Sequence, residues 1–221
     1  LDAADHAAAA LRGQAHGQAS EARIAMLRAQ LSRLDNKPER ERAYLASVLT
    51  TAPEYASLIG AELLECYRRV GQQAEGLEVL RAHYLRHPSL DMFNVVFREL
   101  RAQQGYTPAW TFAREALRAH PSLLGLDRLL EAELAAYEDQ NPIAGGAAEG
   151  ANRLAQTNTA AADVAPGADL SLLRSLIHKH TQRLDRYACR VCGFEARHFY
   201  WQCPGCNSWE TYEPRRLEEM K

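Results

Sequence analysis

Apolar residues recur at helical spacing through most of the first 140 positions of the chain. The i, i+3, i+4, i+7 spacing of a helix with one buried face is met by Phe93, Val96, Phe97 and Leu100. Residues 19–34 and 38–51 predict a further pair of helices, and residues 3–11 predict the last helix of an earlier pair. The pattern therefore indicates a mainly α-helical chain.

A repeated tetrapeptide divides this helical region. His87-Pro88-Ser89-Leu90 recurs as His120-Pro121-Ser122-Leu123, so the two prolines are 33 residues apart, and Pro53 precedes Pro88 by 35. Each of the three prolines closes a helical run. A period near 34 is typical of paired-helix repeats of the tetratricopeptide type, which stack into a superhelix. A helical bundle without repeats is the alternative interpretation.

Positions inside one period agree with this interpretation. Leu63, Leu64 and Tyr67 share one face of a first helix, and Gly71 follows as the turn. Gly76 lies early in the second helix, where a residue without a side chain lets two helices approach closely. The early tryptophan of the usual tetratricopeptide pattern is missing. The sequence thus predicts a tetratricopeptide-type array of helix pairs.

The array is predicted to continue to residue 184 across an interruption. Residues 141–168 are rich in glycine and alanine and contain no aromatic residue, which predicts a flexible insertion. Asp169 is the expected N-cap of a final amphipathic helix, which we expect to pair with the helix before the insertion. The apolar faces expected for these two helices are Leu123, Leu126, Leu130 and Leu134, then Leu170, Leu173, Ile177 and Leu184. The predicted domains are repeats at 1–184 and a second module at 185–221.

The second module is defined by its cysteines. Four of the five cysteines fall within eighteen residues, as two Cys-x-x-Cys pairs separated by ten residues: Cys189, Cys192, Cys203 and Cys206. Each short pair can supply two thiolates to one tetrahedral ion. Gly193 and Gly205 are expected to form the tight turns that aim backbone N–H groups at the sulfurs. The module is expected to be a small β ribbon whose stability comes from metal binding.

The pattern predicts one Zn²⁺ bound by the four cysteines, with iron in the same cage as the alternative. Two disulfides or a thiol redox centre would leave the paired spacing unexplained. A cage closed by four sulfurs leaves no position for a substrate, so hydrolytic metal catalysis is not expected. We expect the module to attach to the last repeat, because the final helix runs almost directly into Cys189.

Composition and charge narrow the function classes. The 221 residues are 47% hydrophobic, and the formal net charge of −2 argues against a strongly cationic nucleic-acid binder. Six arginines between residues 183 and 216 are offset by four carboxylates and by a thiolate cage, so phosphate binding by the ribbon is predicted to be weak. Trp201, Trp209 and Tyr212 are instead expected to pack against neighbouring helices. No apolar run approaches the roughly 18 residues of a membrane-spanning helix.

The sequence offers no catalytic constellation. A phosphate-binding loop, a nucleophile elbow and a dinucleotide fingerprint are all missing from it. Cys66, which lies away from the other cysteines, is expected to be a buried and inert thiol. His178 and His180 are expected on a solvated helix surface. We therefore expect a protein that is not an enzyme.

Helical repeats followed by a rubredoxin-like ribbon resemble the lipopolysaccharide assembly protein B family of Gram-negative bacteria. The resemblance is most specific in Tyr187–Phe194 and Tyr200–Cys206, followed by Trp209. It extends to Glu65–Tyr67 with Gly71 and to the segment 117–121, and it covers most of the chain. The insertion at 141–168 is longer than the family pattern.

The resemblance implies a non-catalytic adaptor. Such proteins help a membrane-bound ATP-dependent metalloprotease degrade the deacetylase that commits precursors to lipid A, and they respond to a membrane lipopolysaccharide sensor. An N-terminal membrane helix, which this sequence does not include, would hold the repeats on the cytoplasmic face of the bacterial inner membrane. The residues matching Cys189, Cys192, Cys203 and Cys206 bind metal in the family.

Several alternatives stay open at this point. The first alternative is a repeat protein associated with a sugar transferase. The second is a rubredoxin-type electron carrier, and the third is a nucleic-acid-binding ribbon. The sequence also leaves open whether the chain forms a homodimer, and which face of the array would bind partner proteins.

Overall fold

The protein is described by a computed structural model that covers residues 17–140 and 166–220. Helices dominate these residues, and a two-stranded antiparallel sheet lies near the C-terminus. The α-helices are α2 (Gly17–Leu34), α3 (Pro38–Thr51), α4 (Ala56–Arg69), α5 (Gln73–Arg86), α6 (Leu90–Gln104), α7 (Tyr106–Ala119), α8 (Leu123–Gln140) and α9 (Pro166–Thr181). The short elements are the 3-10 helices η1 (Pro53–Tyr55) and η3 (Leu217–Met220) and the strands β1 (Tyr187–Ala188) and β2 (Glu195–Ala196).

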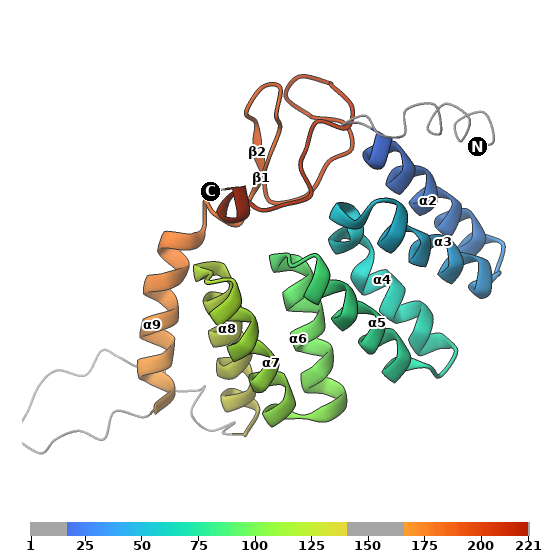
Figure 1. The fold of residues 1–221 in the computed structure, drawn as a ribbon. Coiled ribbons are helices and arrows are strands. Elements are labelled where there is room, and N and C mark those ends of the chain that lie inside the picture. The colour runs from blue at the N-terminus through green and yellow to red at the C-terminus, as the bar shows by residue number, and fades with distance from the viewer. Residues whose placement is uncertain (1–16, 141–165, 221) are drawn as a thin grey trace, which may run out of the picture.

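Consecutive helices pack as pairs, and the pairs stack along the chain. α2 packs on α3, α4 on α5, α6 on α7 and α8 on α9, while α4 also contacts α6 and α6 contacts α8. Contact between alternate helices is the arrangement expected when helix pairs repeat along one axis. The resulting array forms an arc, with α2 at one end and α9 at the other (Figure 1). The predicted helical-repeat fold is confirmed.

Glycines behave as the repeat pattern predicts in the α4–α5 pair. Gly71 has φ +73° at the turn, a backbone conformation that residues with a side chain rarely adopt. Gly76 faces the ring of Tyr67, and a Cβ built on it would lie 2.7 Å from Tyr67 Cγ. The close crossing of α4 and α5 therefore depends on the absence of a side chain at residue 76.

The predicted apolar face of the next pair is also buried. Phe93, Val96, Phe97 and Leu100 are all within the core. Phe93 stacks against Phe97 and Phe112 at ring-centre distances of 6.1 and 5.7 Å, and Tyr84 meets Phe112 edge-on at 5.3 Å. These aromatic contacts join α5, α6 and α7 into one continuous core.

The predicted faces of the last two helices are partly wrong. Leu124 and Leu129 are the buried leucines of α8, whereas Leu123 and Leu126 are exposed. On α9, Leu173 is exposed together with Leu172 and Leu176. These helices lie at the end of the array, where no further helix among the described residues covers their outer sides, so the outer leucines meet solvent.

The boundaries near the insertion also differ from the prediction. α9 begins at Pro166, three residues before the predicted N-cap Asp169, and proline suits the first turn of a helix. α9 packs against α8 as expected, and His178 and His180 are exposed on the helix surface, as predicted. His178 Nδ1 also lies 2.9 Å from Asp127 Oδ2. The predicted helix at 3–11 and residues 141–165 of the predicted insertion lie outside the described residues.

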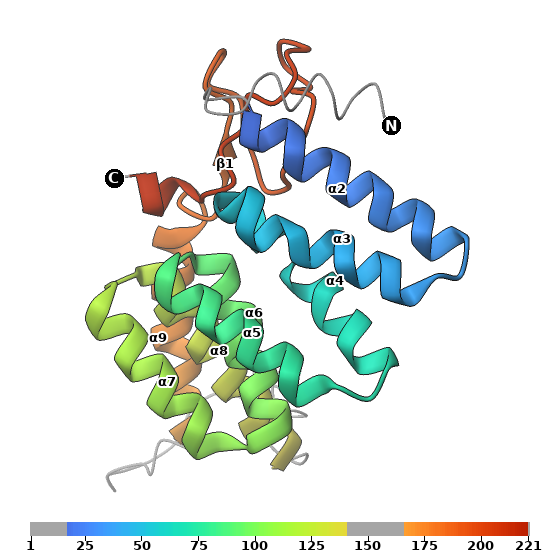
Figure 2. The same ribbon diagram turned by 45° about the vertical axis from the view of Figure 1, so that its right-hand side comes forward.

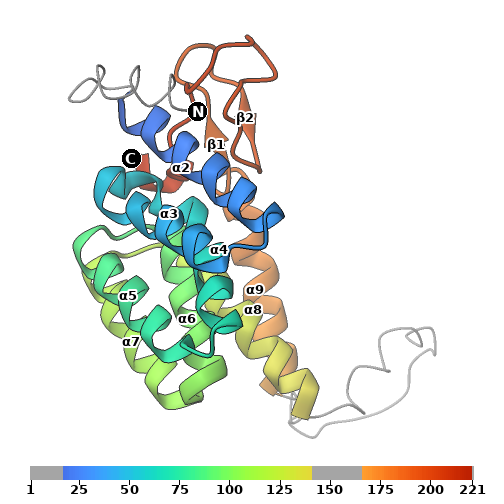
Figure 3. The same cartoon turned by 90° about the vertical axis from the view of Figure 1, so that its right-hand side faces the viewer.

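The cysteine module sits over the helix ends at one edge of the array (Figures 1 and 3). It follows α9 closely, as predicted, but it also reaches the opposite end of the array. Its loops contact α2, where the Ser20 hydroxyl donates to Glu210 at 2.7 Å (Figure 2). The module therefore bridges the first and last described helices rather than extending the last repeat alone.

A helix that spans a bilayer must be both long and strongly apolar. Among residues 17–140 and 166–220, none is both long enough and apolar enough to span a membrane.

Candidate metal centre

Two short backbone loops of the same design hold the four cysteines. In the first, Gly193 N–H donates to the carbonyl of Cys189 and Cys189 N–H donates to the carbonyl of Phe194, at 2.9 and 3.0 Å. In the second, Asn207 N–H donates to the carbonyl of Cys203 and Cys203 N–H donates to that of Ser208, both at 2.9 Å. The loops are thus equivalent, fourteen residues apart, and each presents two sulfurs on one side.

The two predicted turn glycines have different roles in their loops. Gly193 has φ +72°, as a turn glycine should, but the equivalent residue in the second loop is Asn207, with φ +60°. Asparagine is among the residues that tolerate this left-handed conformation best. Gly205 lies in the turn between the second pair of cysteines, and its N–H points at Cys203 Sγ at 3.3 Å, as predicted. A Cβ there would approach Phe194 to 3.2 Å.

The four sulfurs converge. All four Sγ atoms lie within 4.8 Å of one another, with Cys189 and Cys206 3.8 Å apart and Cys192 and Cys203 3.6 Å apart. A tetrahedral ion with metal–sulfur bonds of about 2.3 Å needs sulfurs about 3.8 Å apart, so the spacing fits a single ion. The cysteines are free, and these separations are far above the roughly 2.05 Å of a disulfide bond.

The surroundings of the sulfurs favour thiolates at selected positions. Burial alone would raise the pKa of Cys189, but hydrogen bonds from the Thr211 hydroxyl and from backbone N–H groups outweigh it and lower that pKa to about 6. At Cys192 the backbone N–H of Phe194 favours the thiolate, yet burial and the three neighbouring sulfurs together raise the pKa. Four thiols this close can all ionise only when a cation offsets their charge, which is the role of the metal.

Aromatic side chains attach the module to the first helices. Trp201 stacks on Tyr55 of η1 with ring centres 5.7 Å apart and an interplanar angle of 12°, and Phe199 meets Tyr55 edge-on. Trp209 lies under the guanidinium of Arg23 at 4.0 Å. The predicted packing role is thus met by Trp201 and Trp209. Tyr212 differs, because it is fully buried inside the module and its hydroxyl donates to the carbonyl of Phe194.

A buried ion cluster attaches the module to the later helices. Asp91 of α6 accepts from Nε and Nη2 of Arg216 at 2.9 and 3.1 Å, from Arg128 of α8 at 3.1 Å and from the Tyr187 hydroxyl at 2.7 Å. Burial alone would raise the pKa of Asp91, but the hydrogen bonds and charges of the arginines outweigh it and hold that pKa below its ordinary value. Asp91 is therefore an ionised anchor shared by α6, α8 and the module.

Sequence reasoning missed this anchor and the glutamates that follow it. Glu218 and Glu219 of η3 accept hydrogen bonds from the starts of α8 and α6, at Leu123, Leu124 and Leu90. The repeated His-Pro-Ser-Leu turn was a usable signal, since each copy opens a helix whose free N–H groups attract carboxylates. Local sequence patterns do not connect the turns with the two glutamates, because they lie more than ninety residues apart in the chain.

Cys66, the fifth cysteine, has the predicted character. It is buried on α4, and Arg69 Nη2 lies 3.2 Å from its sulfur. Burial, together with the charge of the nearby Glu41 carboxylate, raises the pKa of the Cys66 thiol to about 11. The thiol is therefore protonated at neutral pH, and thiolate reactivity is suppressed.

Comparison with known proteins matches this geometry. Residues 187–214 match the family model of the rubredoxin metal binding domain. Lipopolysaccharide assembly protein B of Escherichia coli (strain K12) is 24% identical over 215 residues, which cover 97% of this chain and 49% of that protein. The chain is thus similar to lipopolysaccharide assembly protein B over nearly its whole length. The protein of the same name from Haemophilus influenzae is 23% identical over 199 residues, covering 89% of the chain and 44% of that protein.

This relative of lipopolysaccharide assembly protein B thus has a rubredoxin-type module in which four cysteines bind one metal ion, zinc or iron. The family resemblance inferred from the sequence is confirmed. The chain spans about half the length of the curated relatives that it matches.

Proposed function

We propose that this chain is a non-catalytic adaptor that regulates lipopolysaccharide synthesis. The observation that supports this most is the similarity to lipopolysaccharide assembly protein B across 97% of the chain, which includes the helical array as well as the ribbon. A match restricted to residues 187–214 would have supported metal binding alone.

The physical design of the chain supports binding rather than catalysis. Stacked helix pairs, which we interpret as tetratricopeptide-type repeats, present an extended surface to a partner segment. A metal ion held by four cysteines has no open coordination position for a substrate. In this proposal the metal therefore stabilises the module and takes no part in a reaction.

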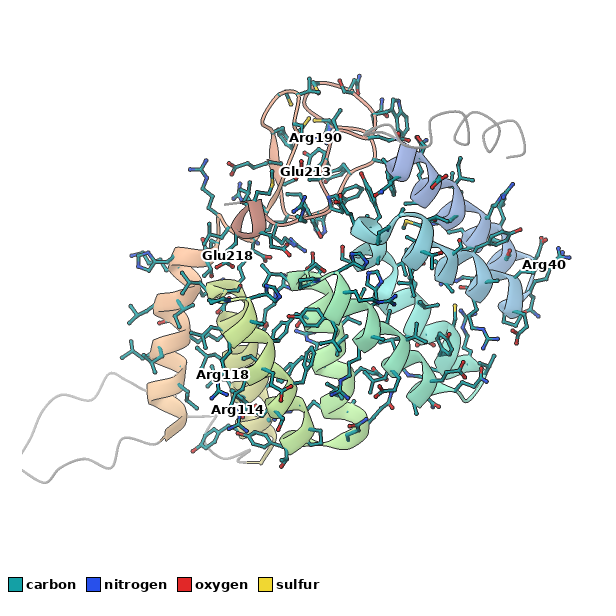
Figure 4. The ribbon with its side chains drawn as sticks, viewed as in Figure 1. Arg40, Arg114, Arg118, Arg190, Glu213 and Glu218 are labelled. Carbon is teal, nitrogen blue, oxygen red and sulfur yellow. The ribbon has the colours of Figure 1, made fainter. Side chains whose placement is uncertain are left out.

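The proposed partners are proteins. The chain would present the deacetylase that commits precursors to lipid A to a membrane-bound ATP-dependent metalloprotease, and a membrane lipopolysaccharide sensor would control that step. It would act at the cytoplasmic face of the bacterial inner membrane, attached by a segment outside the 221 residues. We propose no nucleic-acid partner, because arginines of the ribbon form ion pairs, such as Arg190 with Glu213 (Figure 4) and Arg183 with Glu195.

The adaptor function is tested by breaking the metal cage in cells. We expect Cys203→Ser in the membrane-anchored, full-length protein to lengthen the half-life of the deacetylase at least several-fold, because the ribbon would detach from the array. The half-life is measured by immunoblot after protein synthesis is stopped.

Cys66→Ser is the matched control, since Cys66 is also a buried thiol but lies outside the cage. It should leave the half-life unchanged. A deacetylase half-life that Cys203→Ser does not alter, in cells that contain the variant at the normal level, would contradict the proposal.

A further inference from the structure

The four cysteines of the metal cage differ in how far water can reach them. Cys192 is exposed and Cys206 is half-buried, whereas Cys189 and Cys203 are 2% and 0% exposed. Val191, which precedes Cys192 in the first loop, is 64% exposed. The first loop therefore presents one metal-binding cysteine to solvent, and a small solute that reacts with thiolates meets Cys192 before the two buried cysteines.

A partner for a new sulfur–sulfur bond lies beside the exposed cysteine. The sulfur of Cys192 is 3.6 Å from the sulfur of Cys203, which belongs to the second loop. A disulfide bond is roughly 2.05 Å long, so the two sulfurs need to close a gap of only about 1.5 Å. Cys66, the one cysteine of the sequence outside the cage, is buried on α4. The cage therefore contains both an accessible thiolate and its disulfide partner.

The ribbon depends on the same sulfurs for its core. Its buried core residues are Tyr187, Cys189, Cys203 and Tyr212, so metal ligands supply half of them. A bond between Cys192 and Cys203 would take both sulfurs from the ion and draw Cys203 out of this core. An ion left with two sulfur ligands lacks the closed four-ligand site of a structural zinc ion. Loss of the ion then removes the main source of stability of so small a module.

Two side chains that hold the ribbon on the array each lie two residues before a buried metal ligand. The Tyr187 hydroxyl donates to Asp91 of α6 at 2.7 Å. Trp201 stacks on Tyr55 of η1 with ring centres 5.7 Å apart. The state of the sulfurs therefore affects the array as well, because unfolding of the cage removes both contacts.

We propose that the cage is a redox switch operated by hydroperoxides, with Cys192 as the reacting thiolate and Cys203 as its disulfide partner. Hydrogen peroxide oxidises the Cys192 thiolate to a sulfenic acid, and the second peroxide oxygen leaves as hydroxide. The Cys203 thiolate then attacks the sulfenic sulfur, which forms the disulfide bond and releases a second hydroxide. Two protons from solvent convert the hydroxides into water, so one peroxide accepts the two electrons that the two thiolates lose.

The switch adds an input to the adaptor function proposed above. In the reduced chain the ion keeps the ribbon folded on the array, and in the oxidised chain the ribbon is released. A dithiol reductant and zinc reverse the change, because a disulfide is a reversible product of thiol oxidation. The oxidation itself needs no partner protein, so it is measured on the purified chain.

The test uses the purified zinc-loaded chain and hydrogen peroxide. A chelating dye records zinc release, and peptide mapping after thiol blocking identifies the disulfide. We expect peroxide to accelerate zinc release at least tenfold, with one ion released for each disulfide and Cys192 joined to Cys203 in the first product. Hydrogen exchange in residues 187–214 should rise on oxidation. Dithiothreitol with added zinc should restore the original zinc content and exchange pattern.

Cys66→Ser is the matched control variant, since Cys66 is a buried thiol outside the cage. It should show the same rate of zinc release and the same disulfide, and slower release would assign the reaction to Cys66 instead. Met220 is an internal gauge of the peroxide dose, because this methionine is 41% exposed and its thioether oxidises to a sulfoxide.

Zinc that stays bound while Met220 is oxidised would overturn the switch. A first disulfide within one loop, or between Cys189 and Cys206, would overturn the assignment of Cys192 and Cys203. Zinc release with sulfinic or sulfonic acids in place of a disulfide would overturn its reversibility. The adaptor function fails separately, through an unaltered deacetylase half-life in the Cys203→Ser variant, whatever peroxide does to the purified chain.

Discussion

Individual residues decide how closely neighbouring elements of this chain approach. Gly76 is the sharpest case, because the Tyr67 ring occupies the space where its side chain would be. The atoms in the way are Cβ, Cγ and Cδ2 of Tyr67, near the root of that side chain. They cannot move aside without shifting the backbone of α4, so the contact fixes the spacing of the helix pair.

We expect Gly76→Ala to lower the free energy of unfolding by about 1–2 kcal/mol, because the overpacking cost of about 1–3 kcal/mol exceeds the gain in helix propensity. Gly60→Ala is the matched control. Gly60 is also buried in a helix, but its added Cβ would meet the flexible end of Met92 at 3.4 Å and Val95 Cγ1 at an ordinary contact distance of 3.7 Å. That variant should be neutral or up to about 1 kcal/mol more stable. Equal destabilisation in urea titrations would contradict this account of Gly76.

At the scale of elements, α6, α8 and the ribbon meet at one ionised carboxylate. The side chains of Asp91, Arg128 and Arg216 are 17%, 12% and 13% exposed, so the cluster is largely removed from water. Removing one partner of a buried ion cluster leaves the others without compensation and is costly. The attachment of the ribbon to the later helices therefore depends on the charge of Asp91.

We expect Asp91→Asn to lower the free energy of unfolding by about 3 kcal/mol at pH 7. The pKa of Asp91 is lower in the folded protein than the value of about 3.9 in an unfolded chain. Its stabilising contribution is therefore complete above about pH 4 and is lost as the pH falls through the folded value. The difference between wild type and variant should shrink in that range, measured by urea unfolding from pH 3 to 7.

Asp35→Asn is the control for this pH dependence, because Asp35 forms an exposed ion pair with Lys37. It should change stability by less than about 1 kcal/mol at any pH. The comparison is limited to the pH range in which zinc content shows the ribbon still loaded, because loss of metal would also release Tyr187 and Arg216 from Asp91. A constant difference between wild type and Asp91→Asn across this range would disprove the role of the charge.

The elements themselves were predictable where a helix has partners on both sides. The predicted helix pair at 19–34 and 38–51 matches α2 and α3 to within two residues, because periodic apolar positions and Pro38 define both boundaries. The faces of α8 and α9 were less predictable. Periodicity assumes one buried face, whereas a terminal helix keeps leucines such as Leu126 and Leu173 in contact with solvent.

The metal ligands were predictable because they lie close together in the sequence. The attachment of the ribbon to the helical array was not predictable. Two Cys-x-x-Cys pairs fix the ligands within eighteen residues. The contacts of Glu210 with Ser20 and of Glu218 with Ser122 join residues 190 and 96 positions apart. No local pattern reports such pairs, and Glu218 resembles any exposed glutamate until its position beside the turns is known.

At the scale of the whole molecule, the metal is expected to stabilise the ribbon independently of the helices. We expect chelation of the metal to increase hydrogen exchange throughout residues 187–214, because so small a module has almost no apolar core of its own. The amides of α4 to α7 should keep most of their protection, because the ribbon adds only the partly buried Phe199 and Trp201 to their core. Hydrogen-exchange mass spectrometry with and without chelator measures both regions.

Two results would contradict this prediction. Slow exchange in residues 187–214 after complete metal removal would contradict metal-dependent folding of the ribbon. Uniform loss of protection through α4 to α7 would show that array and ribbon unfold as one unit. Adding zinc back to the chelated protein is the control for irreversible damage and should restore the original exchange pattern.

The bridge that the ribbon makes between the two ends of the array also has a mechanical meaning. An array of stacked helix pairs is flexible along its axis, because each pair contacts only its neighbours and small rotations between pairs accumulate. At one end of the array, Glu210 of the ribbon accepts a hydrogen bond from α2. At the other end, Arg216 pairs with Asp91 of α6, which also pairs with Arg128 of α8. The ribbon therefore cross-links the two ends of the helical array. Because one metal ion keeps the ribbon folded, that ion limits how far the array can open around a bound partner.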